Sequence, residues 1–331
     1  MRTDVAQQGE FFAIHLAIMQ PGTMAPVDLH FKDKATGRFV LYKNAQTPLD
    51  HETRERLLEH AVDVLYLRKE DQDAYDEYVE QNISAIIRDD LLPPEQAGEL
   101  VYKSSSHVMQ DVFEDPRSGK NLQRTQNMVE AMVLSIIKDP DALWHMTAMA
   151  SHDYYTYTHC VNVSLFLVAT SEKLLGINDQ RMLEQIGLGG MLHDIGKSQL
   201  PAEILAKPGK LTAEEFAKIK EHPLLGLQIT AAHMKLRPTS ALIVRSHHEH
   251  FNGAGYPDGM TGDAIPQVAR LANIVDVYDA LTTNRTYAAA RKPYEAIELM
   301  LTQMKEEFDF GMLSAFVRFL GPKDARSQFI P

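Results

Sequence analysis

The sequence predicts an α+β protein in which a small mixed α/β N-terminal domain precedes a long all-α region. Three observations predict this. Short alternating stretches separated by turn residues occur near the N-terminus, which is typical of strands. After the Pro93-Pro94 pair, apolar residues recur three and four positions apart, which is typical of helices. The 331-residue chain is 44% hydrophobic and 24% charged, as expected of a folded globular protein.

The N-terminal elements follow from alternation, capping and periodicity. Two alternating stretches flank the turn residues 33–37 and predict a hairpin. Asp50 is a suitable N-cap for the helix that follows. A short apolar run then predicts a strand, and an acidic segment with one apolar face predicts a second helix. The predicted ranges are 28–31 and 38–42 for the hairpin, 50–59 for the first helix, 62–67 for the strand and 70–88 for the second helix.

The rest of the chain is predicted to be helical, because it shows helical spacing between polar breaks. The predicted helices are 95–112, 121–137, 141–150, 153–175, 180–195, 212–234, 238–250, 266–283 and 293–307. We expect three parts, with boundaries in the polar and proline-containing segments. They are a regulatory domain over residues 1–90, a helical linker region over 91–145 and a functional domain over 146–331.

Charge, cysteine content and hydropathy exclude several classes of protein. The chain has 45 acidic and 33 basic side chains, and a net charge of −12 argues against binding a nucleic-acid polymer. The single cysteine, Cys160, excludes an intramolecular disulfide and a cysteine-rich zinc site. No apolar stretch approaches the ~18 residues of a membrane span, and the run 11–19 lacks the basic flank of a signal peptide. We therefore expect a cytoplasmic protein.

Histidine and aspartate are concentrated beside apolar helices. Nine of the 14 histidines lie between residues 145 and 250. At the end of one apolar helix stand His193 and Asp194, and an aspartate can give one oxygen to each of two cations. Three histidines occur in the four residues 247–250, which are predicted to continue a helix. His222 precedes a proline, and Asp276 lies within an apolar helix, where a carboxylate is costly unless it is paired or bound to a metal.

Neighbouring residues could assist such a site. Gly196 is expected to end the helix, which leaves Lys197 placed to meet an anion beside the metals. Asp279, one turn after Asp276, could orient a ligand, and His159 could add an imidazole. A mixed imidazole and carboxylate set with a shared aspartate suits a pair of Fe, Mn, Zn or Ni ions. Taken singly, the motifs also fit solvated helix ends, a structural histidine and a surface loop.

These residues resemble the signatures of the HD-GYP family, the branch of the HD superfamily that hydrolyses cyclic dinucleotides. The resemblance covers about residues 150–320 and says little about residues 1–140. The matching segments are His193-Asp194 with Gly196-Lys197, the LT…E…H segment from Leu211 to His222, His247-His248-Glu249 with Gly253-Ala254-Gly255-Tyr256-Pro257, and Asp276 to Thr282 followed by Arg285-Thr286-Tyr287.

The resemblance implies a compact all-α HD-type bundle that hydrolyses cyclic di-GMP with two divalent metal ions. Iron is the first choice, with Mn, Zn or Ni as alternatives. The implied metal ligands are His159, His193, Asp194, His222, His247, His248 and Asp276, with Asp194 bridging. The implied catalytic residues are Asp194 and Lys197, and the implied substrate-binding residues are Gly255, Tyr256, Pro257 and Arg285.

The sequence departs from the family pattern around the substrate. Tyr155 stands where some members have a glutamate ligand, so we expect two metals and not three. His250 and Ala288 stand where basic residues are frequent. A second interpretation is therefore a weakly active or inactive metal-binding receptor for a cyclic dinucleotide, or a protein-interaction module. Hydrolysis of another phosphodiester is a third. For the N-terminal part, domain order alone suggests regulation, self-association or contact with a signalling-protein partner.

Overall fold

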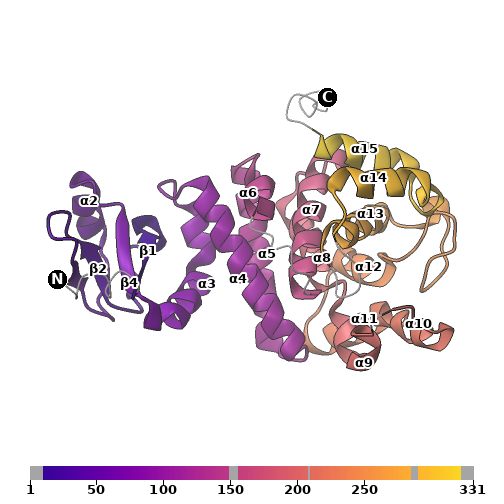
Figure 1. The fold of residues 1–331 in the computed structure, drawn as a ribbon, viewed down its shortest axis with the longest axis horizontal. Helices are drawn as coiled ribbons and strands as arrows, with labels where there is room; N and C mark the ends of the chain where they lie inside the picture. The colour runs from indigo at the N-terminus through magenta and orange to yellow at the C-terminus, as the bar shows by residue number, and fades with distance from the viewer. Residues whose placement is uncertain (1–9, 149–155, 208, 285–289, 322–331) are drawn as a thin grey trace. The chain divides into compact units, whose positions relative to one another are not determined.

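A computed structural model of the chain describes residues 10–148, 156–207, 209–284 and 290–321. Two units can be distinguished, Met1–Ser104 and Ser105–Pro331 (Figure 1). The first contains a small antiparallel sheet, and the named elements in the described part of the second are all helices. The predicted α+β class is therefore confirmed.

The N-terminal sheet has four strands in the order β1-β4-β2-β3. The predicted hairpin is present, because β2 and β3 pair antiparallel with Phe31 opposite Val40. The first strand was not predicted, since the run 11–19 was considered only as a leader; it pairs with β4 along its whole length. The strands are β1 (Phe11–His15), β2 (Leu29–Lys32), β3 (Phe39–Lys43) and β4 (Val64–Arg68).

Two helices and two short 3-10 turns complete this unit, namely α2 (His51–Glu59), α3 (Gln72–Arg88), η1 (Leu16–Ile18) and η2 (Lys69–Asp71). The predicted cap of α2 is confirmed, because the Asp50 side chain accepts the Thr53 N–H at 2.7 Å. Helix α3 buries Tyr75, Val79 and Ile86 on one face, as its apolar spacing predicts.

The helical unit begins within α4, which crosses the division at residue 104. Its longer helices are α4 (Pro94–Glu114), α5 (Gly119–Lys138), α7 (Thr156–Leu175), α8 (Gln180–Leu192), α11 (His222–His233), α13 (Gln267–Thr282) and α15 (Phe310–Leu320). The shorter elements are α6 (Ala142–Ala148), α9 (Ala202–Leu205), α10 (Ala213–Ile219), α12 (Pro238–Ser246), α14 (Pro293–Thr302), η3 (Ile195–Gln199), η4 (Gly262–Ala264) and η5 (Lys305–Glu307). Helices α9 and α15 were not predicted.

The centre of the helical unit is the pair α7 and α8. Helix α8 also packs against α5 and α12, and α13 packs against α7. Glycines allow the two central helices to approach closely, because a Cβ on Gly190 would lie 2.7 Å from the Ser164 Cα atom. The Ser164 hydroxyl donates to the Gly187 carbonyl at 2.8 Å. This close packing fixes where the end of α8 lies relative to the start of α7.

Three local predictions are corrected by the structure. The helix predicted over 212–234 is two helices, α10 and α11, with Lys220 and Glu221 between them. The helix predicted over 238–250 ends at Ser246, so the three histidines that follow lie in a turn. Gly196 does not cap α8, which ends at Leu192. It lies in η3, where a Cβ would be 1.9 Å from the His222 carbonyl oxygen, so glycine is needed for close backbone approach.

Part of the predicted linker region belongs to the helical unit, since α5 packs directly on α8.

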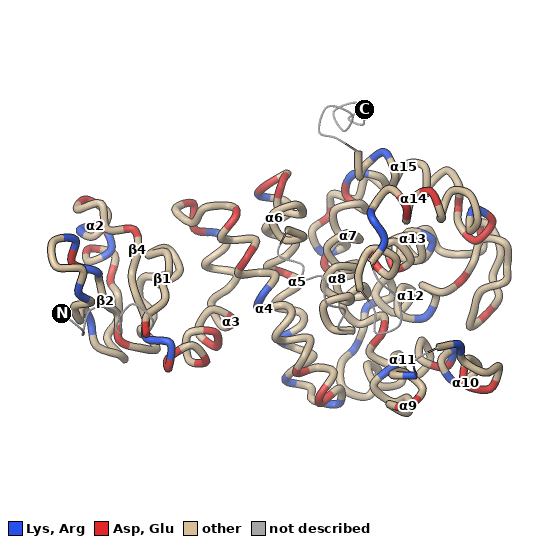
Figure 2. The backbone as a smooth tube through the Cα atoms, viewed as in Figure 1, with Lys and Arg blue, Asp and Glu red and all other residues tan. Residues whose placement is uncertain are grey.

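Lysine and arginine are interspersed with aspartate and glutamate along the helices of each unit (Figure 2). None of the helices in the described ranges is both long and apolar enough to span a bilayer.

Candidate metal centre

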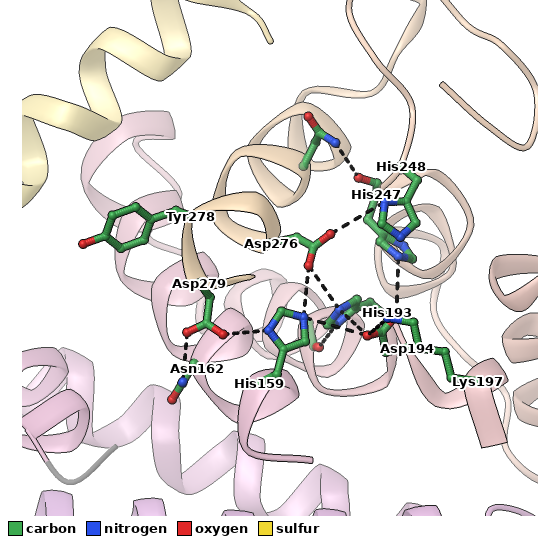
Figure 3. Close-up of polar contacts among 12 residues, drawn as sticks. His159, Asn162, His193, Asp194, Lys197, His247, His248, Asp276, Tyr278 and Asp279 are labelled. Atoms are coloured by element: carbon green, nitrogen blue, oxygen red, sulfur yellow. Dashed lines mark hydrogen bonds and ion pairs between the residues drawn. The ribbon is translucent and has the colours of Figure 1, made fainter. Parts of the chain in front are cut away.

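Side chains on or directly after five helices of the helical unit meet in one largely buried cluster (Figure 3). His159 comes from the first turn of α7, and His193 and Asp194 directly follow α8. Asp276 lies on α13. The remaining predicted ligands are the first residue of α11, His222, and the two residues that follow α12, His247 and His248. The structure thus brings all seven predicted ligands together from segments far apart in the sequence.

The cluster contains two groups of possible ligand atoms that share Asp194. One group is Asp194 with His222, His247 and His248, and the other is Asp194 with His159 and His193; within each group the ligand atoms lie within 4.8 Å of one another. Asp276 is placed between the groups. Its Oδ1 lies 3.0 Å from His159 Nε2, and its Oδ2 lies 3.7 Å from His248 Nδ1.

Hydrogen bonds at Nδ1 orient four of the imidazoles. The Nδ1 atoms of His193 and His222 each face a backbone carbonyl at 2.7 Å, those of Gly190 and Ile219. His247 Nδ1 faces the Ile243 carbonyl at 3.1 Å, and His159 Nδ1 faces a carboxylate. Because each partner is an acceptor, Nδ1 carries the proton and Nε2 presents its lone pair to the cluster.

Burial keeps His222, His247 and His248 neutral. Desolvation lowers the pKa of His222 to about 4, although the nearby Asp194 opposes this shift. Burial likewise lowers the pKa of His248 to about 3 and that of His247 well below its usual value. For Asp194, burial alone would raise the pKa, but Lys197 and His193 outweigh it and hold the pKa well below the ordinary range. In the cluster, these three neutral imidazoles therefore lie beside the ionised carboxylates of Asp194 and Asp276.

This donor set fits divalent metal ions. His193 Nε2 and Asp194 Oδ1 are buried and make no hydrogen bond within the described residues. The Nε2 atoms of His222 and His247 lie 3.2 Å apart with lone pairs facing each other, an arrangement that a cation would stabilise. Nitrogen and oxygen donors of this kind suit Fe, Mn, Zn or Ni.

Polar residues outside the predicted ligand set hold it in place. Asp279 Oδ2 accepts the His159 Nδ1–H at 2.7 Å, and its Oδ1 accepts the Asn162 amide at 2.9 Å, as Figure 3 shows. Asp279 therefore lies where it can orient the His159 ring, as the sequence predicts. The Asn273 amide donates to the His247 carbonyl at 3.0 Å. Asn162 and Asn273 were missed, although each is a polar residue inside an apolar helix, the signal that identified Asp276.

The predicted catalytic lysine contacts the shared aspartate. Lys197 Nζ lies 2.5 Å from Asp194 Oδ2, in the one-turn geometry that η3 imposes. The aspartate is fully buried and the lysine side chain is partly exposed. An ammonium in this position offsets the negative charge of the two carboxylates and faces the edge of the cluster.

The loop that carries Tyr256 folds over the histidines. Its base is held by buried Glu249, whose carboxylate accepts the backbone N–H groups of Asp258 at 2.7 Å and Met260 at 2.9 Å. A Cβ on Gly255 would lie 2.2 Å from the His250 nitrogen, so this glycine lets the loop lie against the backbone below it. The Tyr256 ring lies 4.7 Å from the His248 ring.

The other predicted substrate residues give less information. Pro257 follows Tyr256 in the loop and is partly exposed. Arg285 lies outside the described residues, as do Tyr155 and Ala288. The loop-holding role of Glu249 was missed, because a glutamate after two histidines gives no sign of where its carboxylate is bonded.

Comparison with known proteins gives consistent matches. Residues 145–311 match the family model of the HD domain. The chain is 35% identical over 227 residues to the cyclic di-GMP phosphodiesterase PA4108 of Pseudomonas aeruginosa, which covers 67% of this chain and 53% of the relative. It is 32% identical over 163 residues to the 3'3'-cGAMP-specific phosphodiesterase 2 of Vibrio cholerae, covering 49% of this chain and 31% of the relative.

A solved structure has the same fold. Bd1817, an HDG"Y"P protein from Bdellovibrio bacteriovorus, aligns with a TM-score of 0.63 at 20% identity, covering 93% of this chain and 98% of that one. The chain spans about half the length of the Pseudomonas relative and less of the Vibrio relative.

Proposed function

Because the chain belongs to the HD domain family, in its HD-GYP branch, we propose that it is a phosphodiesterase that hydrolyses cyclic di-GMP with a pair of divalent cations. The observation that carries the proposal is Asp194, whose buried carboxylate belongs to both groups of ligand atoms. A carboxylate shared in this way is suited to bridge two cations.

Six side chains besides Asp194 would hold the cations. His222, His247 and His248 would complete one site, and His159, His193 and Asp276 the other. When bound, two such cations act as Lewis acids on the phosphoryl oxygens and lower the pKa of a water molecule toward neutrality. Iron is our first choice of metal, with Mn, Zn or Ni as alternatives that the same donors accept.

The protein's own residues prepare the site for an anionic substrate. Hydrogen bonds at Nδ1 keep the His193, His222 and His247 rings from rotating, and burial lowers the pKa of His222, so no proton competes at its Nε2. Lys197 stands beside Asp194 and would offset the charge that builds on the phosphate as the ribose oxygen leaves. Tyr256 would form one wall for the nucleotide, with Gly255 and Pro257 shaping its loop. Arg285 would hold a phosphate through its planar guanidinium.

A receptor with little turnover is the alternative. It is favoured by His250, which stands where the family often has a cation and whose Nδ1 lies 3.7 Å from the Glu307 carboxylate. In that case the module would bind metal and cyclic dinucleotide and act through a protein partner. Since one relative is named for 3'3'-cGAMP, that dinucleotide is a second candidate substrate. The N-terminal unit would then regulate the helical unit or mediate self-association.

Metal loading and turnover test the proposal. Protein purified anaerobically with Fe²⁺ or Mn²⁺ should contain two metal ions per chain by elemental analysis and should cleave cyclic di-GMP. The double variant His193→Ala/Asp194→Ala should lose both metal and turnover. His233→Ala, at the far end of α11, is the matched control and should lose neither. Loaded protein that binds the dinucleotide without cleaving it would establish the receptor, and loss of cyclic di-GMP cleavage with retained 3'3'-cGAMP cleavage would change the substrate.

A further inference from the structure

A cation and two aromatic rings lie together at the edge of the candidate metal centre. Lys220 Nζ lies 4.8 Å from the centroid of the Phe216 ring and 5.5 Å from that of Tyr256. We call these three residues the rim cluster. Phe216 is on α10, Lys220 follows that helix directly, and Tyr256 is in the loop over the histidines.

The rim cluster adjoins the ligands without being part of the ligand set. The Tyr256 ring is 4.7 Å from the His248 ring and 6.2 Å from the His222 ring. Lys220 precedes His222 by two residues, at the break between α10 and α11. The rim cluster therefore extends outward from the ligands, from Tyr256 beside His248 to Lys220 and then Phe216.

The exposure of Phe216 has no explanation in packing. Helix α10 has no buried residue, and the Phe216 side chain is 46% exposed. The helix is stabilised by other means, because Thr212 and Glu215 form a capping box and Glu215 also binds Lys207 Nζ at 2.7 Å. An aromatic ring that the fold does not use is thus presented beside the proposed active site.

Lys220 carries a charge that the protein leaves available. Among the described residues no carboxylate forms an ion pair with it: the adjacent Glu221 does not, and Glu215 on α10 is bound to Lys207. The other cation at this edge, Lys197, is held by Asp194. The faces of the two rings attract the Lys220 ammonium electrostatically. The ammonium can therefore bind an anion without first breaking an ion pair.

We propose that Phe216 and Lys220 form an outer subsite for the half of the cyclic dinucleotide that is not cleaved. This inference rests on the proposed function and deepens it. The Phe216 ring stacks a purine base, and Lys220 binds the second phosphate, which cannot occupy the metal pair together with the first. A flat ring next to an available cation is the combination that binds a base and its phosphate in single-stranded nucleic acids.

The test compares Lys220→Met and Phe216→Ala with matched controls on the same surface. Lys218→Met removes an exposed lysine of α10, and Leu224→Ala removes an exposed apolar side chain of α11. For each Mn²⁺-loaded full chain, we would measure metal content, the Kd of a fluorescent cyclic di-GMP analogue, and steady-state hydrolysis of cyclic di-GMP. Bis(p-nitrophenyl) phosphate, which lacks the second phosphate and both purines, is the comparison substrate.

Each rim variant should weaken dinucleotide binding by about 5- to 50-fold, the range of one stacking or one charged contact. KM should rise with kcat within about 2-fold, and bis(p-nitrophenyl) phosphate hydrolysis should be unchanged. The loss in Lys220→Met should shrink as salt increases, because a charge contact is screened. The controls should match the wild type.

Three results would overturn the subsite. The rim variants could bind the dinucleotide as tightly as the controls, they could lose both substrates equally, or they could lose metal. Unchanged dinucleotide binding would mean that the rim cluster binds something else, such as a protein partner. Equal loss of activity on both substrates, or loss of metal, would mean that the rim cluster supports the metal centre itself. Wild-type protein that binds the analogue without hydrolysing cyclic di-GMP would refute only the proposed turnover, whereas failure to bind it would refute both.

Discussion

Replacing Asp279 with alanine should weaken one of the two cation sites and leave the other intact. Asp279 contacts only His159 among the predicted ligands, through a 2.7 Å hydrogen bond to Nδ1. His159 belongs to one ligand group, and His222, His247 and His248 belong to the other. Without the carboxylate, the His159 ring loses the acceptor that fixes its tautomer.

The magnitude follows from the groups that lose a partner. The substitution leaves the buried His159 Nδ1–H and the Asn162 amide without Asp279, and each such buried donor costs about 1–3 kcal/mol. Removal of an acceptor behind a ligating histidine typically lowers metal affinity by about 10- to 100-fold. Asp279→Asn keeps an acceptor oxygen for His159 and should recover part of this loss.

Competition with a chromophoric chelator measures both sites in one titration. The wild type should show two binding steps for Mn²⁺ or Zn²⁺, and Asp279→Ala should show one step unchanged and one weakened. Far-UV circular dichroism checks that the helices remain. Equal weakening of both steps, or no weakening of either in a folded variant, would refute the assignment of Asp279 to His159 alone.

Three further predictions use other parts of the site. Glu249→Ala should remove the acceptor of two loop N–H groups, raise KM about 10-fold or more and leave metal content unchanged by elemental analysis; metal loss would contradict this. Gly196→Ala should destabilise the protein by about 1–3 kcal/mol in urea unfolding, because its Cβ meets backbone atoms that cannot rotate away, and an unchanged midpoint would be inconsistent with that contact. Metal-free protein should lose about 1 kcal/mol of stability for His222 between pH 7.5 and 5.5, because the unfolded chain, with a pKa near 6.5, binds a proton in this range while the folded histidine, with a pKa of about 4, does not; urea midpoints that are flat or rise toward pH 5.5 would argue against a buried neutral imidazole.

The ligand set could be predicted because its members are polar or ionisable residues in or beside apolar helices. Asp276 inside an apolar helix and His193-Asp194 at the end of another are costly unless they bind something, and this cost is visible without a structure. The same reasoning applied to Asn162 and Asn273 would have identified two supporting residues. His159 was singled out because it begins an apolar helix, and the family resemblance then implied the complete ligand set.

Other features depend on tertiary contacts that leave no local pattern. The role of Gly196 is set by the His222 carbonyl, 26 residues further along the chain, so its sequence context suggested a helix cap instead. Strand β1 is stabilised by its pairing with β4. The apolar run that contains it could equally be a strand, a helix or a leader segment, so the sequence alone does not identify it as a strand. The break at Lys220 does carry a local signal that the prediction did not use, because Pro223 lies in the first turn of α11, where proline is favoured, and would be costly inside a continuous helix.

The glycine contact between α7 and α8 has a consequence for redesign. Because Gly190 leaves no side chain between its backbone and Ser164, the separation of these helices is set by main-chain atoms. His159 lies on α7 and His193 directly follows α8, so the spacing between these two ligand positions is set by the backbone. Replacing one ligand by another residue type would change which metal ion is preferred. Changing the distance between the ligands would require a different packing of α7 against α8.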